Sequence, residues 1–287
     1  MSRAPDFDDY RAAVAELAAE VRRGAAPDGR SAEAILARRL DSGPFAAVLS
    51  ATPQGRDETA ATLLTEVRSY QASSGGSASG AARLVRIAML AQIDTVWWGG
   101  LPEYQTDADV LDSADLADLD ELRLAGELRF SYRNQPATLL TRAARSAERH
   151  TWPGRVPRTA GLWLARGRPQ VVAWLDQLAA EFAKIAPPDT PPLWVNSLAR
   201  SVAHQRHLKS LGYLALLPSS HCVGYAADIE MTWYRRFRAH RLLRGLLLDR
   251  QRAGQVNVID EGQAWHVCLC PQRLDASWLV PGPRPGS

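Results

Sequence analysis

A histidine and an aspartate stand seven residues apart in the C-terminal part of the chain, as His221 and Asp228. A neutral imidazole and a carboxylate are both good ligands for Zn²⁺. Between them, Gly224 and Ala226 are small enough to let the backbone pass close to a metal and its substrate. His266, in an expected strand, is the natural third ligand, and three ligands leave a fourth position for water. The sequence therefore predicts a mononuclear zinc site.

The residues around these candidates resemble the LAS-type zinc metallopeptidases, a group that includes D-Ala-D-Ala carboxypeptidases, dipeptidases, lysostaphin-type endopeptidases and the hedgehog signalling domain. The resemblance covers residues 193–271. The upstream part looks like the Tyr-Arg-Ser segment of the carboxypeptidase branch. The motifs are His221-x-x-Gly224-x-Ala226-x-Asp228, Trp265-His266-Val267 and Arg200-Ser201-x-x-x-Gln205-x-x-Leu208.

This resemblance implies a small peptide substrate, such as one that contains a D-amino acid or derives from peptidoglycan. Zinc would lower the pKa of a water towards ~7, and the resulting hydroxide would attack an amide carbonyl. Arg200 would help to bind the substrate and stabilise the oxyanion. Ser201, Gln205 and Ser220 are the further substrate-binding candidates.

The sequence departs from the family at the general base. The carboxypeptidase and dipeptidase branches have a Glu or Asp three positions before the second histidine, where this chain has Gln263, although some members of the group also lack this acid. The nearest carboxylates are Glu261 and Asp260, and we take Glu261 as the replacement. Losing general base catalysis would cost roughly 10²–10⁴ in rate. The alternative is therefore a non-hydrolytic zinc module that binds a ligand or a protein.

Each candidate also has a structural interpretation. His221 and Asp228 could form a hydrogen-bonded pair without a metal, and Arg200 could be an ordinary salt-bridge arginine. His204 and His207 are expected on the exposed side of a helix rather than at a second metal site.

Other polar groups of this region favour a structural role. Cys268 and Cys270 could share a strand face with His266, but buried, unreactive thiols are the better expectation. Glu230 could support the ligand at position 228. The arginines from Arg235 to Arg252 suit the solvated side of an amphipathic helix.

Composition excludes several classes of protein. The 287 residues carry a formal net charge of +3, which is too balanced to indicate nucleic-acid binding. Three cysteines do not describe a disulfide framework. We find neither a secretory leader nor the roughly 18 apolar residues of a membrane span, so a cytoplasmic enzyme without a membrane partner is the default. Release by lysis or a dedicated apparatus would look the same, and the oligomeric state stays open.

The patterning predicts an α+β protein. A mostly helical region of unknown role, 1–188, would end at a proline-rich linker, and it could itself act through protein interaction. Residues 189–287 would form the zinc domain, a small antiparallel sheet with helices. Helices are expected at 7–23, 57–69, 84–98, 106–125, 137–149, from 169, at 201–211 and 231–252, with a flexible loop at 71–81 and strands at 193–195, 224–229, 256–259 and 265–269.

Overall fold

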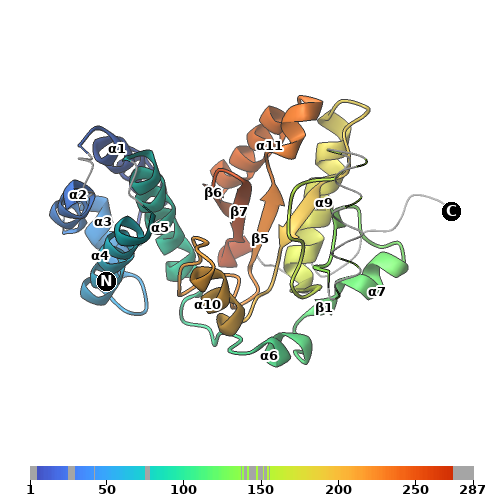
Figure 1. Ribbon diagram of the computed structural model, residues 1–287, viewed down its shortest axis with the longest axis horizontal. Helices are drawn as coiled ribbons and strands as arrows, with labels where there is room; N and C mark the ends of the chain where they lie inside the picture. Colours follow the sequence, from blue (N-terminus) through green and yellow to red (C-terminus); the bar gives the residue numbers. More distant parts are fainter. Residues whose placement is uncertain are drawn as a thin grey trace. The chain divides into compact units, whose positions relative to one another are not determined.

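The computed structural model has the predicted α+β character (Figure 1). It describes residues 5–24, 30–41, 43–74, 78–136 and 156–273, together with positions 138, 141, 147, 151 and 154. The helix predicted at 137–149 lies largely outside the described residues. The chain forms two compact units, unit 1 (Met1–Pro102 with Lys209–Ser219) and unit 2 (Glu103–Leu208 with Ser220–Ser287).

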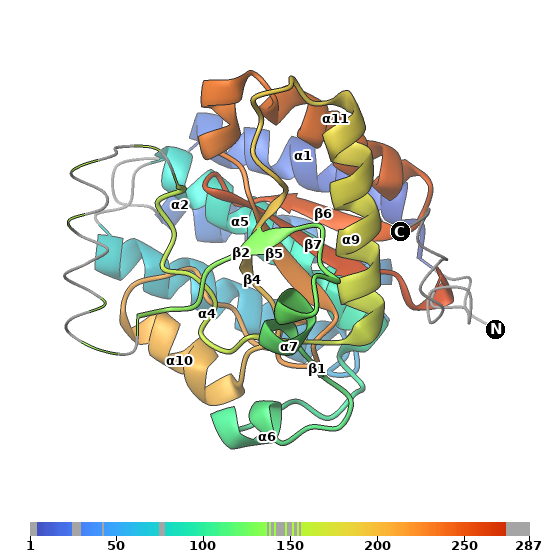
Figure 2. The same ribbon diagram turned by 90° about the vertical axis from the view of Figure 1, so that its right-hand side faces the viewer.

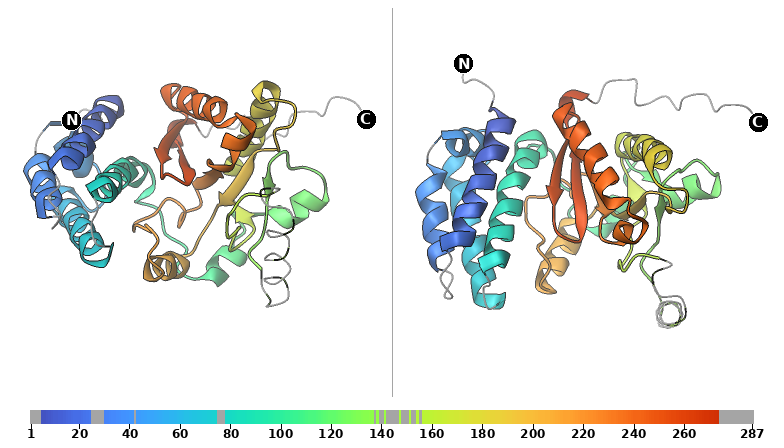
Figure 3. Two further views of the ribbon diagram at one scale, coloured as in Figure 1. Left: turned by 45° about the horizontal axis from the view of Figure 1, so that its top comes forward. Right: turned by 90° about the horizontal axis from the view of Figure 1, so that it is seen from above.

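Unit 1 is helical, and its helices lie side by side (Figure 3). The apolar α5 packs along α1, and the Tyr10 hydroxyl donates a hydrogen bond of 2.7 Å to the Met89 carbonyl in the core. The described helices are α1 (Phe7–Gly24), α2 (Arg30–Leu40), α3 (Gly43–Ser50), α4 (Arg56–Ser74) and α5 (Ala78–Trp98). None of the helices in the described part of the chain is long and apolar enough to cross a membrane.

The flexible loop predicted at 71–81 is wrong where the structure describes it. Helix α4 continues to Ser74 and α5 begins at Ala78. Ala81 and Ala82 are buried. Packing of these helix-favouring alanines outweighs the weak local propensity of the neighbouring Ser and Gly residues.

Unit 2 is built on a five-stranded sheet in the order β2-β4-β5-β7-β6. The sheet is mixed rather than wholly antiparallel, because β2 pairs with β4 in parallel. Helices α9 (Pro169–Ile185) and α11 (His240–Arg252) lie beside one another against the sheet (Figure 2). The strands are β2 (Ser131–Tyr132), β4 (Trp194–Ser197), β5 (Ala226–Glu230), β6 (Val256–Asp260) and β7 (Ala264–Leu269).

The compact units divide the chain elsewhere than at the predicted boundary between 188 and 189. Strand β2 and helix α9 come before the proline-rich linker, yet both belong to unit 2. The ring of Phe182 in α9 packs edge-on against Tyr234, 5.1 Å between centroids. The Tyr234 hydroxyl donates to the carbonyl of Pro192 in the linker, at 2.7 Å. The linker therefore connects two elements of one unit.

Two predicted helices are interrupted. The segment 231–252 forms a 3₁₀ helix, η1 (Trp233–Phe237), and then α11, separated by Arg238 at φ 57°. The segment 106–125 forms α6 (Asp107–Leu111) and α7 (Leu119–Leu124), separated by β1 (Ala117–Asp118), which pairs with β3 (Arg166–Gly167). Asp118 restarts the helix, because its carboxylate accepts from the backbone N–H groups of residues 120 and 121. The other predicted elements overlap helices or strands of the structure, whereas α3, β2 and β3 have no predicted counterpart.

Candidate metal centre

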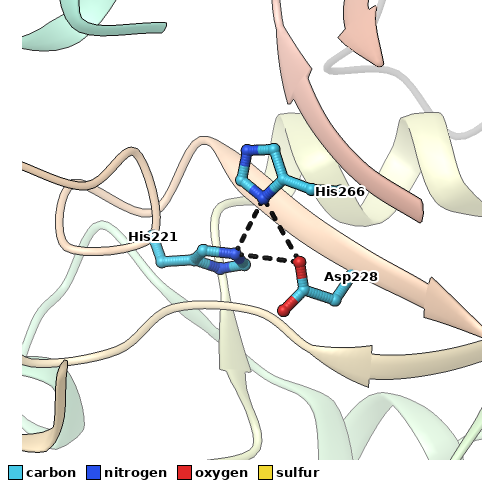
Figure 4. A group of neighbouring side chains, drawn as sticks. All are labelled: His221, Asp228 and His266. Atoms are coloured by element: carbon cyan, nitrogen blue, oxygen red, sulfur yellow. Dashed lines mark hydrogen bonds and ion pairs between the residues drawn. The ribbon is translucent and has the colours of Figure 1, made fainter. Parts of the chain in front are cut away.

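Three side chains from distant parts of unit 2 meet at one point: His221, Asp228 and His266 (Figure 4). Nε2 of His221 lies 3.1 Å from Oδ1 of Asp228 and 3.2 Å from Nδ1 of His266. Nδ1 of His266 lies 3.2 Å from the same oxygen of Asp228. All three residues are buried. The group, in which each residue offers one ligand atom, could hold a metal ion.

The sheet positions two of the three residues. Asp228 on β5 stands directly opposite His266 on β7. Side chains alternate across a sheet, so directly opposed residues share a face. The antiparallel register alone therefore brings the carboxylate and the imidazole together.

A tight turn before β5 positions His221. The backbone N–H of Gly224 donates to the His221 carbonyl at 3.1 Å. Gly224 has φ +81°, and a Cβ there would lie 3.1 Å from Cγ of Arg168 and 3.3 Å from Cδ2 of Leu116. The small residue thus serves the turn and its packing against Arg168 and Leu116, and its role in making room for a metal and its substrate stays a prediction.

Neighbouring groups orient both imidazoles. Nδ1 of His221 lies 2.7 Å from the Leu198 carbonyl oxygen, which can only accept, so Nδ1 carries the proton and Nε2 presents a lone pair to the group. Nε2 of His266 lies 3.4 Å from Oγ of Ser220. Donors and acceptors beside metal-binding histidines commonly fix the tautomer in this way.

Arg200 holds the carboxylate. Its Nη2 donates to Oδ2 of Asp228, the oxygen that points away from the two histidines. Burial acts to raise the pKa of Asp228, but the facing His221 and the Arg200 guanidinium lower it well below its ordinary value. Burial, followed by the charge of Arg200, lowers the pKa of His221. An ionised carboxylate and a neutral imidazole are the forms that bind metal.

The spacing of the three atoms suits a tetrahedral ion. Zinc bonds to His and Asp are about 2.0–2.2 Å long, which places neighbouring ligand atoms of a tetrahedral ion about 3.3–3.6 Å apart. The three observed separations are 3.1–3.2 Å. Oδ1 of Asp228 and Nε2 of His221 are both acceptors, and Nδ1 of His266 is a third acceptor when the proton of that ring lies on Nε2, so the residues present fit a divalent cation.

The three predicted substrate-binding residues, Ser201, Gln205 and Ser220, all make contacts within the protein. Ser201 is fully buried at the start of α10 (Val202–Ser210), where its hydroxyl donates to Asp107 and accepts from the His204 N–H at 2.9 Å. Gln205 is buried and its Oε1 accepts from Nη1 of Arg200 at 3.3 Å. Ser220 adjoins a candidate ligand, as described above. The structure thus places Arg200, Gln205 and Ser220 around the group and Ser201 at a helix cap.

The predicted catalytic carboxylate lies on the turn between β6 and β7. Gln263, at the family's base position, is exposed, and Glu261 is half-buried. The Glu261 N–H donates to the Ala264 carbonyl at 3.1 Å, and Oδ1 of Asp260 accepts from the Gly262 N–H at 2.8 Å. Among the described residues, no further His, Cys, Asp or Glu joins the metal-binding group.

Glu230, which sequence analysis considered as support for Asp228, is a structural carboxylate. Oε2 accepts from Nδ2 of Asn196 at 3.2 Å. Oε1 accepts from the Thr232 hydroxyl and the Trp233 N–H, both at 3.0 Å, and so begins η1. Sequence reasoning missed Ser197 and Leu198, which contact Arg200 and His221. The Leu198 contact is made by a backbone carbonyl, so no side-chain motif could reveal it.

The remaining candidates lie outside the group. Cys268 and Cys270 are buried, as expected, and neither joins it. His204 is buried instead of exposed, with its ring stacked on Trp163 at 4.8 Å and 7°. The exposed side predicted for His207 is confirmed.

Comparisons with family models, with curated proteins and with solved structures give no match for this chain. The resemblance to the LAS-type peptidases therefore stays a prediction. The geometry around His221, Asp228 and His266 is the feature of this chain that supports a function.

Proposed function

We propose that the chain is a zinc-dependent hydrolase that cleaves an amide bond in a small peptide. The single observation behind this proposal is the convergence of three buried ligand atoms, one each from His221, Asp228 and His266, at mutual distances of 3.1–3.2 Å. Two imidazoles and one carboxylate with a fourth position open are the pattern of catalytic rather than structural zinc sites. Bound zinc would supply Lewis-acid activation of a water molecule.

The chain's own residues provide the remaining functions in this proposal. The Leu198 carbonyl and the Arg200 guanidinium hold His221 and Asp228 in their binding orientations. Glu261, on the turn that leads into the strand of His266, is the candidate proton acceptor. The choice of a peptide with a D-amino acid or a peptidoglycan origin comes from the resemblance alone.

A second candidate function is a non-hydrolytic zinc module that binds a ligand or a protein. Two observations favour it. The base position carries the exposed Gln263, and no further carboxylate of the described residues joins the group. Arg200, the candidate for oxyanion stabilisation, is engaged by Asp228.

Metal analysis and cleavage assays separate these functions. The purified chain should contain one zinc ion, and it should cleave members of a panel of short peptides with L- or D-residues at the C-terminus. A chelator should abolish the cleavage and added zinc should restore it. One zinc with no cleavage across the panel would favour the binding module. A chain that takes up no metal would contradict both functions, and His221, Asp228 and His266 would then be held together by hydrogen bonds alone.

The general base needs its own variant. Glu261→Gln should retain zinc and lose about 10²–10⁴ in kcat, the usual contribution of a general base. The matched control is Glu121→Gln, because Glu121 is an exposed glutamate on α7 of the same unit. A Glu261→Gln variant with full activity would exclude Glu261 as the base.

A further inference from the structure

We infer that Arg200 is a positioning residue of the metal centre, which fixes the carboxylate of Asp228 so that only one oxygen faces the two imidazoles. This inference rests on the proposed zinc site. It differs from the role that the resemblance implies, in which the arginine contacts the substrate.

All three guanidinium nitrogens of Arg200 are engaged within unit 2. Nη2 donates to Oδ2 of Asp228. Nε donates to the hydroxyl of Ser197 at 2.6 Å, and Nη1 donates to Oε1 of Gln205 at 3.3 Å. The planar guanidinium is therefore held in one orientation from three sides. The three bonds use three of the five N–H groups of the guanidinium, so any contact with an oxyanion would have to come from the two others, within the plane that these bonds fix.

The ion pair is sheltered from solvent. The side chains of Arg200 and Asp228 are 16% and 10% exposed. Charge-assisted hydrogen bonds in such surroundings are short and directional, whereas exposed ion pairs contribute little. The contact is thus strong enough to set the orientation of a carboxylate.

The orientation matters for coordination. Because Arg200 occupies Oδ2, Asp228 offers only Oδ1 to the group, at 3.1 Å from Nε2 of His221 and 3.2 Å from Nδ1 of His266. A carboxylate without this partner could rotate or offer both oxygens to an ion. Arg200 therefore selects a single-oxygen ligand and keeps the fourth position open.

Arg200 also reaches a second candidate ligand through its backbone. Its N–H donates to the carbonyl of His221 at 3.1 Å. The carbonyl of Leu198, two residues before Arg200, accepts from Nδ1 of the same histidine at 2.7 Å. The short segment 197–200 thus orients two of the three ligands, which explains why a residue outside the group can control its geometry.

Zinc affinity tests this inference without an activity assay. The dissociation constant for zinc is measured by competition with a chromophoric chelator for the wild type, Arg200→Gln and Arg200→Lys. We expect Arg200→Gln to raise it about 10- to 100-fold, as is usual when the partner of a metal ligand is removed. Arg200→Lys should give a smaller increase, because it keeps the charge but loses the planar fork.

The matched control is Arg166→Gln. Arg166 also pairs with an aspartate of unit 2, Asp118, at 3.0 Å with both side chains 25% exposed. Because this pair lies outside the metal-binding group, the zinc dissociation constant of Arg166→Gln should stay within twofold of wild type. Thermal unfolding shows whether each variant is folded. If Arg200→Gln does not fold, the zinc affinity of Arg200→Lys tests the inference in its place.

Cobalt substitution adds a spectroscopic readout. The visible absorption of Co²⁺ depends on the number and arrangement of its ligands, so Arg200→Gln should change the spectrum while Arg166→Gln should not. Wild-type affinity and an unchanged spectrum in folded Arg200 variants would overturn the inference and return Arg200 to a substrate-contacting role. A wild type that binds neither metal would instead overturn the proposed function itself.

Discussion

Asp228 and His266 stand directly opposite each other on β5 and β7, with Oδ1 and Nδ1 3.2 Å apart. A register slip of one residue would send either side chain to the other face of the sheet. The metal-binding group therefore depends on the pairing of these two strands, and His221 is added by the turn that leads into β5.

Removing one ligand should remove the metal. We expect His266→Ala and Asp228→Ala to lower the zinc content from one ion per chain to nearly none, because two remaining protein ligands do not make a zinc site. Elemental analysis after gel filtration measures this. His204→Ala is the control, since His204 is a buried imidazole of the same unit outside the group. Equal zinc content in His266→Ala and His204→Ala would contradict the assignment.

Acid should destabilise the fold through His204. Burial, and then the charge of Arg200, lower the pKa of His204 to about 4 from an ordinary value of 6.5. Between these two values the unfolded chain binds a proton that the folded chain does not, so the free energy of unfolding falls as pH falls. The decline is at most about 1.4 kcal/mol per pH unit for one proton, and this contribution is constant above pH 6.5.

Denaturant titrations at several pH values, with a chelator present, measure this slope. His204→Gln should show a shallower decline than wild type between pH 6.5 and 4. Parallel curves for wild type and His204→Gln would refute the role of His204.

The sequence could predict His221, Asp228 and His266 as candidate ligands because their residue types and spacing resemble a known zinc-binding motif. The sequence predicts strands for both Asp228 and His266, but the pairing that sets the two residues opposite each other joins positions 38 residues apart and leaves no spacing pattern. What one sequence could not predict is the direction of Arg200, because its side chain is placed by acceptors from Ser197 and Gln205 as well as by Asp228. Tertiary contacts of this kind leave no spacing pattern.

The domain boundary was not predictable for a related reason. A proline-rich stretch signals an extended connector, whether it joins two domains or two elements of one. The parallel pairing of β2 with β4 and the packing of α9 on α11 show that the linker is internal to unit 2. Both contacts join residues far apart in the chain.

The turn that carries His221 should not tolerate a side chain at Gly224. Gly224→Ala combines a positive φ with a Cβ 3.1 Å from Cγ of Arg168, whereas Gly254→Ala has the positive φ but nothing within 4 Å. We expect Gly254→Ala to lower the free energy of unfolding by about 1–2 kcal/mol. Gly224→Ala should cost at least about 1 kcal/mol more because of the added overpacking.

Gly224→Ala should also weaken zinc binding, because the Gly224 N–H donates to the His221 carbonyl and a shifted turn would move the ligand. Denaturant unfolding and chelator competition provide the two measurements. If both variants lose the same stability and bind zinc equally well, the close packing of Gly224 has no consequence for the site.

Unit 2 contains every residue that the proposed metal centre needs, so a fragment of residues 103–273 should fold and bind one zinc ion. A shorter fragment that starts at residue 189, the predicted boundary, lacks β2 and α9. It would leave β4 as an unpaired edge and expose the apolar residues that pack against α9, among them Tyr234. Circular dichroism and zinc content compare the two fragments. We expect the shorter fragment to be unfolded or aggregated. If it instead folds and binds zinc as tightly as the longer fragment, residues 189–273 are sufficient for the site.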